Sequence, residues 1–469
     1  MVRKGQAMNR ILGFLGGMAT VALLSWWAGF TPRQVLAVAI FAGMILATLL
    51  FWSFRLAFAF LAVALLLASG LLDVPHFIEF SQIDIVIFLV AMMVVVGYLE
   101  ERRFFEHVLE SVFDFLKPNA WQFCLLIMVL GATSAALVDE VTSILFMTAI
   151  TLHFISGRRV SPVPFVVMLV FATNIGSAAT VVGNPVGVMV ALQGGLTFSD
   201  FLRWASPVAL VSLVVTVLLS LWYFRKPIRE LQARIEEAGS ESQGKFEKEA
   251  SSSRPWGSWL IFVGLIGGLV LHSPIESMLG LEKNAMLLGT ALAFAGMVLL
   301  LDRTRAREIV EKRVDWWTLI FFLTLFASVG ALRLVGVTGQ IARLMIHLAG
   351  DSQSALMIVL MWTGGIMSAL MDNVLGVATL IPVVQDLQAQ GIHAFPLWWG
   401  LLFGGTFFGN VTMIGSTANI IAIGVLERRR LGLIDFWTWL KPGLLVGVVT
   451  LGLATLLLWL QLPLMGTHP

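Results

Sequence analysis

The sequence predicts an all-α polytopic membrane protein with about eleven transmembrane helices, two re-entrant hairpins and two inverted repeats. Composition is the first observation: of 469 residues, 58% are hydrophobic and 12% are charged, whereas a soluble domain has roughly 25% charged residues. The second is a series of apolar runs of about 20 residues, the length that an α-helix needs to cross a bilayer. The third is a pair of matching polar motifs inside these runs.

The predicted transmembrane helices are the apolar runs that the loops separate. They lie at residues 11–30, 34–52, 56–72, 83–99, 162–193, 202–224, 257–272, 284–301, 315–335, 395–426 and 436–460. Glycine and polar residues interrupt two of them, 162–193 and 395–426. Basic residues precede the first run, which continues past signal-peptide length without a cleavage site of small residues, so we predict a membrane helix there.

Two further apolar stretches, 120–156 and 353–388, have polar residues at their centres. If each stretch enters and leaves the membrane on the same side, Lys and Arg collect in the loops of one face, as the positive-inside rule requires of cytoplasmic loops. Arg158 and Arg159, the seven basic residues of 225–254, and the arginines of 428–430 lie on that face. We therefore predict two re-entrant hairpins, a cytoplasmic N-terminus, an external C-terminus and a location in the cell (inner) membrane.

A polar, Ser-rich stretch divides the sequence near its middle. Residues 225–256 are predicted to form a partly helical cytoplasmic linker. The linker separates an N-terminal membrane half at 1–224, with repeat 1 at about 34–224, from a C-terminal half at 257–469 that holds repeat 2. Segments 104–117 and 337–350 have the pattern of amphipathic helices that lie in the membrane interface.

An internal repeat relates the two halves. The segment SAALVDEVTSI (134–144) matches MSALMDNVLGV (367–377), which aligns Asp139 with Asp372 and Glu140 with Asn373. TNIGSAATVVGNPVG (173–187) likewise matches GNVTMIGSTAN (409–419), with nearly the same offset along the chain. By the loop charges, one hairpin opens from the cytoplasm and the other from outside, so the repeats are inverted. Inverted repeats with interrupted helices near the bilayer midplane are typical of secondary transporters.

The hairpin tips carry Asp139, Glu140, Asp372 and Asn373 at membrane depth. A charge there costs roughly 2.5–3.5 kcal/mol on insertion scales, so it indicates a water-filled cavity, a bound cation or a proton. Burial favours the neutral form of a carboxyl group, whereas a nearby cation or a helix N-terminus favours the charged form. Protonation and cation binding would then exclude one another. The alternative is that Asp139 and Asp372 only cap the second arms of the hairpins, and both roles can coexist.

The two interrupted runs combine Asn, Gly, Thr and Ser inside apolar helices. Broken backbone at membrane depth survives where it lines a cavity or is buried in protein. Freed carbonyl, Asn and Thr oxygens suit Na⁺, whereas half-helix N-termini suit anions; close packing at a kink is the alternative. The predicted ion- and substrate-binding residues are Asp139, Glu140, Thr142, Ser143, Asn174, Thr180, Gly183, Asn184, Asp372, Asn373, Asn410, Thr412, Gly415, Ser416, Thr417 and Asn419. The candidate Na⁺ ligands among them are Asp139, Asn174, Asp372 and Asn410.

Other classes of function are excluded or disfavoured. The net charge of +2 gives no indication of nucleic-acid binding. The single cysteine, Cys124, excludes an intrachain disulfide and a thiolate metal cluster. No GxxxxGK[ST] sequence is present, so ATP would enter only through a separate ATPase subunit. The expected partners are the lipid bilayer and a small ion.

Four motifs carry a resemblance to a known family. The segments SAALVDEVTSILFMTAI, NIGSAATVVGNPVG, SALMDNVLGVATLIPVV and GNVTMIGSTANIIAIGVLERRRLGLIDFWTWLKPG are similar to the paired signatures of the Ion Transporter superfamily. The closest branch is that of arsenite-pump membrane subunits, NhaD-type sodium/proton antiporters and P protein, which carry citrate-transporter-like domains. The resemblance implies a scaffold that forms a homodimer and a transport domain that moves like an elevator.

The chain departs from that family pattern at two places. Many relatives have Asp-Asn at both tips, whereas this chain has Glu140 at the first. Relatives often read GDPPN where this chain has the segment 183–187, GNPVG.

The leading functional prediction is a secondary active transporter that exchanges a cation, Na⁺ first, for protons. Asp139 and Asp372 are the predicted coupling carboxylates, and Glu140 adds a titrating group. H⁺ and Na⁺ are the coupling ions, with no cofactor and no enzymatic activity. Export of arsenite or antimonite, or transport of a citrate-like carboxylate, is the alternative, and an open channel is the next. An intramembrane aspartyl protease is disfavoured, because no Gly-x-Gly-Asp sequence includes Asp139 or Asp372.

Overall fold

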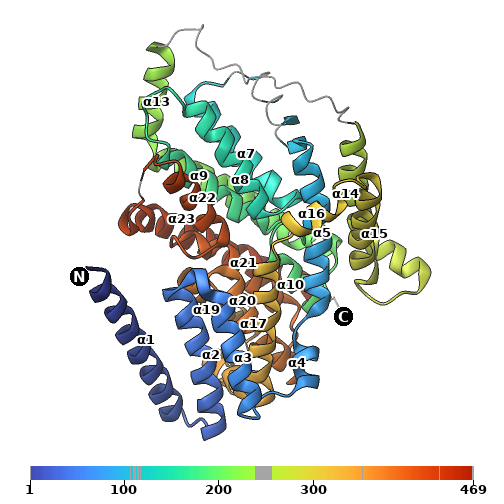
Figure 1. Cartoon of the computed structure of the whole chain (residues 1–469). Helices are drawn as coiled ribbons and strands as arrows, with labels where there is room; N and C mark the ends of the chain where they lie inside the picture. The colour runs from blue at the N-terminus through green and yellow to red at the C-terminus, as the bar shows by residue number, and fades with distance from the viewer. Residues whose placement is uncertain are drawn as a thin grey trace. The chain divides into compact units, whose positions relative to one another are not determined.

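The computed structural model describes residues 2–105, 107–108, 112, 116, 118–237, 256–350, 352–432 and 434–466. All regular secondary structure in these ranges is helical (Figure 1), which confirms the predicted all-α class. The linker residues 238–255 and much of the segment 104–117 lie outside the described residues, so the predictions for them stay predictions. The described start of the linker forms α13 (Arg225–Glu237).

Eight helices among the described residues are long and apolar enough to cross a membrane. They are α2 (Pro32–Leu50), α5 (Ile83–Glu101), α7 (Ala120–Leu137), α11 with α12 (Phe198–Tyr223), α14 (Trp256–Leu279), α17 (Trp316–Leu334), α19 (Gln353–Met371) and α23 (Phe436–Met465). Shorter apolar stretches include Gly13–Trp27 within α1 (Val2–Trp27), and the helices α3 (Arg55–Ala68), α8 (Glu140–Ile155), α9 (Val163–Ser177), α10 (Pro185–Gly194) and α15 (Ala285–Leu301). Each predicted span coincides with one or two of these helices or with α21 (Phe395–Phe407) and α22 (Thr417–Arg428). The total of eleven crossings stays a prediction.

The chain divides into two compact units that draw on both halves of the sequence. Unit 1 comprises Met1–Val90, Asp315–Leu356 and Ala378–Ala394. Unit 2 comprises Ala91–Val314, Met357–Val377 and Phe395–Pro469. Compact units therefore do not follow the order of the sequence, and the predicted domain boundaries near 224 and 256 stay predictions.

In unit 1, α17 is the central helix and packs against α2, α3, α4 (Val74–Phe80) and α18 (Val337–Ala349). The last of these covers the segment 337–350 that the sequence predicts to be an amphipathic helix. At the end of α17, Arg333 Nε lies 3.3 Å from Asp386 Oδ1, and Thr338 Oγ1 donates to the other carboxylate oxygen over 2.6 Å. This ion pair joins α17 and α18 to residues of α20 (Asn373–Ala389).

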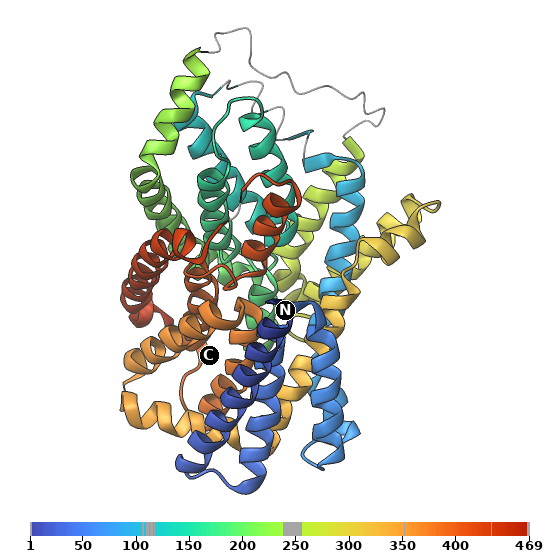
Figure 2. The same cartoon turned by 60° about the vertical axis from the view of Figure 1, so that its left-hand side comes forward.

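In unit 2, α7 and α8 are the arms of the first hairpin, and both pack against α9 (Figure 1). α9 is almost completely buried from Phe165 to Ser177, which explains why its sequence is apolar without a polar face. α21 (Phe395–Phe407) and α22 (Thr417–Arg428) also contact α9, and α22 lies beside α8 (Figure 2). α9 therefore occupies the centre of this unit, where its C-terminal end enters the candidate site.

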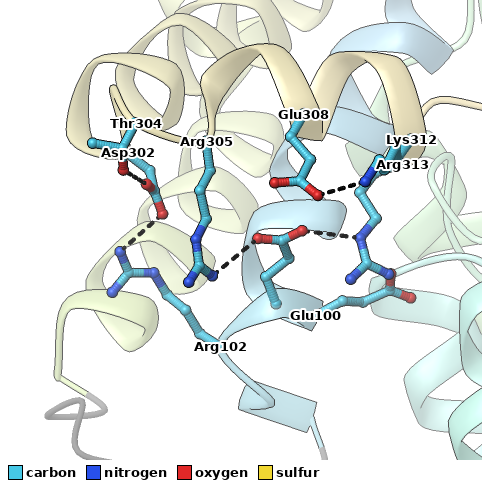
Figure 3. A network of polar contacts seen from close by, with 9 residues as sticks. Glu100, Arg102, Asp302, Thr304, Arg305, Glu308, Lys312 and Arg313 are labelled. Carbon is cyan, nitrogen blue, oxygen red and sulfur yellow. Dashed lines mark hydrogen bonds and ion pairs between the residues drawn. The ribbon is translucent and has the colours of Figure 1, made fainter.

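A charged network joins the C-terminal end of α5 to α15 and α16 (Ala306–Lys312) in unit 2 (Figure 3). Glu101 forms ion pairs with Arg305 and Arg313 at 3.5 and 3.3 Å, and Arg102 pairs with Asp302 at 3.5 Å. Arg313 also packs closely over Gly97 of α5. Single ion pairs of this kind contribute little to stability. The network therefore fixes the position of α16 against α5 and adds little to the stability of that contact.

Candidate ion-binding site at the two hairpin tips

The first hairpin turns at Asp139, between α7 and α8. The sequence folds this way because a carboxylate can accept a hydrogen bond from the free N–H groups at a helix start. Asp139 Oδ1 accepts a hydrogen bond from Thr142 N over 2.8 Å. Glu140 follows in the first turn of α8 and is 1% exposed. The predicted capping role of Asp139 is therefore present, and its neighbour is the buried carboxyl group.

The second hairpin turns at Asp372, between α19 and α20. Its backbone is left-handed, with φ at 84°, a conformation that Asp and Asn adopt more readily than most other residues. Asp372 Oδ1 accepts from Val374 N over 2.9 Å, and Thr417 Oγ1 donates to Oδ2 over 2.8 Å. Asp372 is 2% exposed, so this carboxyl group is bonded by the start of its own helix and by the start of α22.

Glu140 and Asn373 bring the two tips into direct contact. Asn373 Nδ2 donates to Glu140 Oε1 over 3.2 Å. On the other side, Ser177 Oγ lies 3.2 Å from Glu140 Oε2 and 3.0 Å from the carbonyl oxygen of Asn174, so its proton has two acceptors. Asn184 Nδ2 donates to Ser177 Oγ over 2.7 Å. Both carboxyl oxygens of Glu140 are thus contacted by neutral groups, an amide at the start of α20 and a hydroxyl in α9.

The two interrupted helices begin again at the site with a capping residue. Asn184 Oδ1 accepts from Gly187 N over 2.7 Å at the start of α10, and Ser416 Oγ accepts from Ala418 N over 3.2 Å at the start of α22. The preceding glycines permit a close backbone approach. A Cβ atom on Gly183 would overlap the carbonyl oxygen of Ser177, and one on Gly415 would lie 2.5 Å from the carbonyl oxygen of Gly409.

One threonine joins each interrupted segment to a hairpin by a hydrogen bond. The Thr180 hydroxyl donates to the carbonyl oxygen of Ala136, and the Thr412 hydroxyl donates to that of Ala369. Each acceptor lies in the last turn of a first hairpin arm, where the carbonyl groups have no helical partner. Both predicted threonines therefore position the tips and satisfy the ends of α7 and α19.

A buried amide network connects α9 to the second interrupted segment. Asn174 Nδ2 donates to Asn410 Oδ1 over 2.7 Å and to Asn419 Oδ1 over 2.9 Å, while Ser416 Oγ donates to Asn174 Oδ1. Asn419 in turn donates to the carbonyl oxygens of Gly409 and Thr412. These carbonyl acceptors fix the orientation of the Asn419 amide, so its oxygen faces Asn174. The predicted Na⁺ ligands Asn174 and Asn410 are already hydrogen-bonded to each other.

The remaining predicted residues are Thr142 and Ser143, both in the first turn of α8. Thr142 contributes its backbone N–H to Asp139. The Ser143 hydroxyl is buried and has no hydrogen-bond partner among the described residues. Sequence reasoning missed Ser177, and also Ser368, whose hydroxyl donates to the carbonyl oxygen of Gly405 over 2.5 Å. Both lie inside the quoted motifs, where nothing in the local sequence distinguishes them from hydroxyl residues that bond their own helix.

The site is rich in oxygen atoms and helix starts. Its charged groups are the carboxyl groups of Asp139, Glu140 and Asp372, and the groups that contact them are amides, hydroxyls and backbone N–H groups. A buried carboxylate without a cation is strongly destabilised. A proton or a bound cation would lower the cost of burying Glu140 and Asp372, and carboxyl, amide and hydroxyl oxygens are suitable ligands for Na⁺.

Comparison with known proteins places this geometry in a family. A family model described as Citrate transporter matches residues 47–404 and 336–467. An uncharacterized transporter of Mycobacterium tuberculosis is 31% identical over 384 residues, covering 81% of this chain and 86% of that protein. The P protein of Homo sapiens is 26% identical over 457 residues, covering 82% of this chain and 54% of that protein.

A solved structure shares the fold. The YdaH transporter of Alcanivorax borkumensis matches with a TM-score of 0.55 and 15% identity, covering 83% of this chain and 87% of that chain. With the apolar helices, these matches identify an integral membrane protein of the transporter class, and they confirm the resemblance that the four motifs indicate. The chain belongs to the citrate transporter family of the Ion Transporter superfamily.

Proposed function

We propose that this protein is an ion-coupled secondary active transporter that exchanges a monovalent cation, Na⁺ first, for protons. The contact between Glu140 and Asn373 carries the proposal, because it places a buried carboxyl group where both hairpin tips meet. Any change in the separation of the tips alters the hydrogen bonds and the burial of a carboxyl group in this position. Its proton occupancy and the conformation of the hairpins are therefore linked.

The surroundings of Glu140 accommodate both a charged and a neutral carboxyl group. When charged, Glu140 accepts hydrogen bonds from Asn373 and Ser177. A cation bound between Glu140 and Asp372 then offsets the negative charge. When protonated, its O–H donates to Ser177 Oγ, which then donates to the carbonyl oxygen of Asn174, 3.0 Å away. Each state satisfies its hydrogen bonds, so neither is trapped. A proton and a cation compete for the same carboxyl group, which is the basis of exchange.

We propose further that two inverted repeats build this site. Helix starts recur at offsets of 232 or 233 residues: Ile83 and Trp316, Ala120 and Gln353, Glu140 and Asn373, Val163 and Phe395, Pro185 and Thr417. The contact between Glu140 and Asn373 joins equivalent positions, as expected beside a two-fold axis. An elevator motion, a homodimer, a cytoplasmic N-terminus and an external C-terminus belong to this proposal.

A citrate-like carboxylate carried with a cation is the second candidate. The description of the matching family model favours it. So do the N-termini of α8, α20, α10 and α22, which begin at residues 140, 373, 185 and 417 of the site motifs and carry positive partial charge. The three carboxyl groups oppose an anion unless a bound cation neutralises them, so this substrate requires cation symport.

The test is flux into proteoliposomes that contain the purified protein. A pH-sensitive dye inside the vesicles reports proton movement when Na⁺, Li⁺ or K⁺ is added outside, and parallel vesicles receive labelled citrate or arsenite. Na⁺-driven alkalinisation of the vesicle interior that Asp372→Asn abolishes supports exchange, whereas acidification would indicate symport of Na⁺ with protons. Citrate uptake that requires Na⁺ supports the second candidate. Wild-type exchange in Asp372→Asn would remove that residue from the coupling site.

A further inference from the structure

Two arginine-bearing loops lie together at the far ends of α8 and α22. α8 starts at the site with Glu140 and α22 starts there with Thr417, and the two helices pack against each other. The chain after α22 returns to the start of α9, where a Cβ atom on Gly432 would lie 3.0 Å from Val163. The loop after α8 leads into the same helix start. The arginines of the two loops are Arg158, Arg159, Arg428, Arg429 and Arg430.

These five guanidinium groups have no ion-pair partner within the described ranges of the chain. Arg158 is half-buried, with its guanidinium 4.5 Å from the centre of the Phe154 ring, and burial lowers its pKa. Arg428 donates only to the carbonyl oxygen of Gly424. Glu427 and Asp435 are the acids next to the arginines in the sequence, and Lys441 interacts electrostatically with Asp435. Five positive and two negative charges leave the two loops with a net charge of +3. Such a cluster favours binding of an anion that is not part of the protein.

Large apolar side chains border the arginines. Leu431, Phe436 and Trp437 are 41%, 50% and 62% exposed. Phe436 and Trp437 follow Asp435, which caps α23 by accepting from Thr438 N. Exposed aromatic residues beside basic residues are typical of a position at the headgroup level of a bilayer. A soluble anion would explain the arginines and leave the exposed Trp437 without a role.

Two of the arginines have a strained backbone conformation. Arg159 and Arg430 each adopt a left-handed conformation, with φ at 54° and 55°. Glycine would take that position after a helix without strain. A residue with a side chain is strained in this conformation, and binding of a ligand by the guanidinium would offset that strain.

We propose that the loop 156–161 and the residues 428–432 and 434–435 form a binding site for the phosphate headgroup of an anionic phospholipid. Arginine matches phosphate through two parallel hydrogen bonds, and the acyl chains would lie against Leu431, Phe436 and Trp437. The site sits at the ends of α8 and α22, whose other ends hold Glu140 and Thr417. It is independent of which ion the protein transports.

The experiment uses the full-length protein in nanodiscs of phosphatidylcholine alone or with phosphatidylglycerol. Native mass spectrometry then gives the ratio of bound phosphatidylglycerol to phosphatidylcholine. Replacing Arg428, Arg429 and Arg430 with Gln should lower the preference for phosphatidylglycerol about a hundredfold, because each basic residue at an anionic surface contributes about fivefold. The charge-conserving triple Lys variant should retain most of it.

The matched control replaces Arg225, Lys226 and Arg229 of α13 with Gln, which removes three charges from another exposed basic stretch of the described chain. It should keep the wild-type preference. An equal loss in both triple variants would reduce the effect to general charge and overturn the site. Stabilisation by inorganic phosphate in neutral nanodiscs, equal to that by phosphatidylglycerol, would identify a soluble-anion site and also overturn the proposal. If the triple Gln variant does not fold, the double variant Arg159→Gln/Arg430→Gly takes its place. Its ratio of bound phosphatidylglycerol to phosphatidylcholine should fall below that of the wild type, and an unchanged ratio would overturn the proposal.

Discussion

Asn373 donates a hydrogen bond to Glu140 over 3.2 Å, although the two residues are 233 positions apart and occupy equivalent places in the two hairpins. A carboxyl group and an amide at one pair of equivalent positions make the two half-sites chemically unequal. Asn373 offers a donor that suits a charged or a neutral Glu140. This pair therefore contributes one carboxyl group, that of Glu140, where an acid at both positions would add a second beside Asp139 and Asp372.

Glu140→Gln should keep the fold and lose proton coupling. The amide retains an oxygen for Asn373 and an N–H₂ group for Ser177, but it cannot exchange a proton at physiological pH. A positioned acid–base group contributes about 10²–10⁴-fold, so we expect proton-coupled flux to fall at least about a hundredfold in proteoliposomes. Glu140→Ala should also lose about 1–3 kcal/mol of stability because the buried Nδ2 group of Asn373 loses the carboxyl acceptor that it has in the wild type. A pH profile of Glu140→Gln equal to that of the wild type would leave Glu140 with a purely structural role.

Asp372→Asn and Asp372→Ala should separate charge from backbone strain. Asn adopts the left-handed φ of Asp372 readily and can still bond Thr417 and Val374 N, so its thermal midpoint should stay near the wild-type value. Ala at this φ costs roughly 1–2 kcal/mol and loses both hydrogen bonds. Cation-driven flux should vanish in both variants, while thermal stability falls only in the second. If the two variants unfold at the same temperature, the strain assigned to this tip is absent.

Gly183→Ala and Gly415→Ala should each destabilise an interrupted helix. The added methyl group meets a backbone carbonyl oxygen, of Ser177 or of Gly409, and backbone cannot move aside as a side chain can. Overpacking of this kind typically costs about 1–3 kcal/mol. Gly452→Ala is the matched control, because its Cβ meets no atom within 4 Å inside α23, and a helical Gly→Ala change is stabilising by up to about 1 kcal/mol. Thermal midpoints that rise in all three variants would contradict the close approach.

Asn174→Asp should distinguish a hydrogen-bond donor from a Na⁺ ligand. The substitution keeps oxygen atoms for a cation and removes the N–H₂ group that bonds Asn410 and Asn419. Two buried acceptors would then lose their donor, so we expect a stability loss of about 2 kcal/mol or more. Thr216→Val is the control, since its buried hydroxyl bonds only its own helix, at Ser212. A stable Asn174→Asp protein with stronger Na⁺ activation would instead support direct Na⁺ ligation.

The breaks in the helices could be predicted because their causes are local. A carboxyl residue in an apolar stretch, followed by a helix-forming segment, gives the starts of α8 and α20, and Gly with Asn or Ser gives the starts of α10 and α22. The meeting of Glu140 with Asn373 could not be predicted in this way. Equivalence in a repeat says that two residues have similar surroundings, whereas their distance depends on how both hairpins pack.

Ser177 and the amide network were beyond sequence reasoning for a related reason. A serine in an apolar helix most often bonds the carbonyl group one turn earlier, so nothing local distinguishes Ser177 from such a residue. Asn174 was predicted to bind Na⁺ from its oxygen, and the structure shows where its nitrogen donates. Donor and acceptor are both present in every amide, and only the surrounding partners decide which one matters.

The interleaving of the two compact units bears on biosynthesis. Unit 1 needs Met1–Val90 together with Asp315–Leu356 and Ala378–Ala394, so its first helices emerge long before their last partners. At 5–20 residues per second, about 15–60 s separate residue 90 from residue 394 during translation. During this interval the early helices depend on the bilayer and the insertion machinery for their environment. Truncated chains that end before Ala394 should therefore be recognised by quality-control proteases, even though each helix they contain is already inserted.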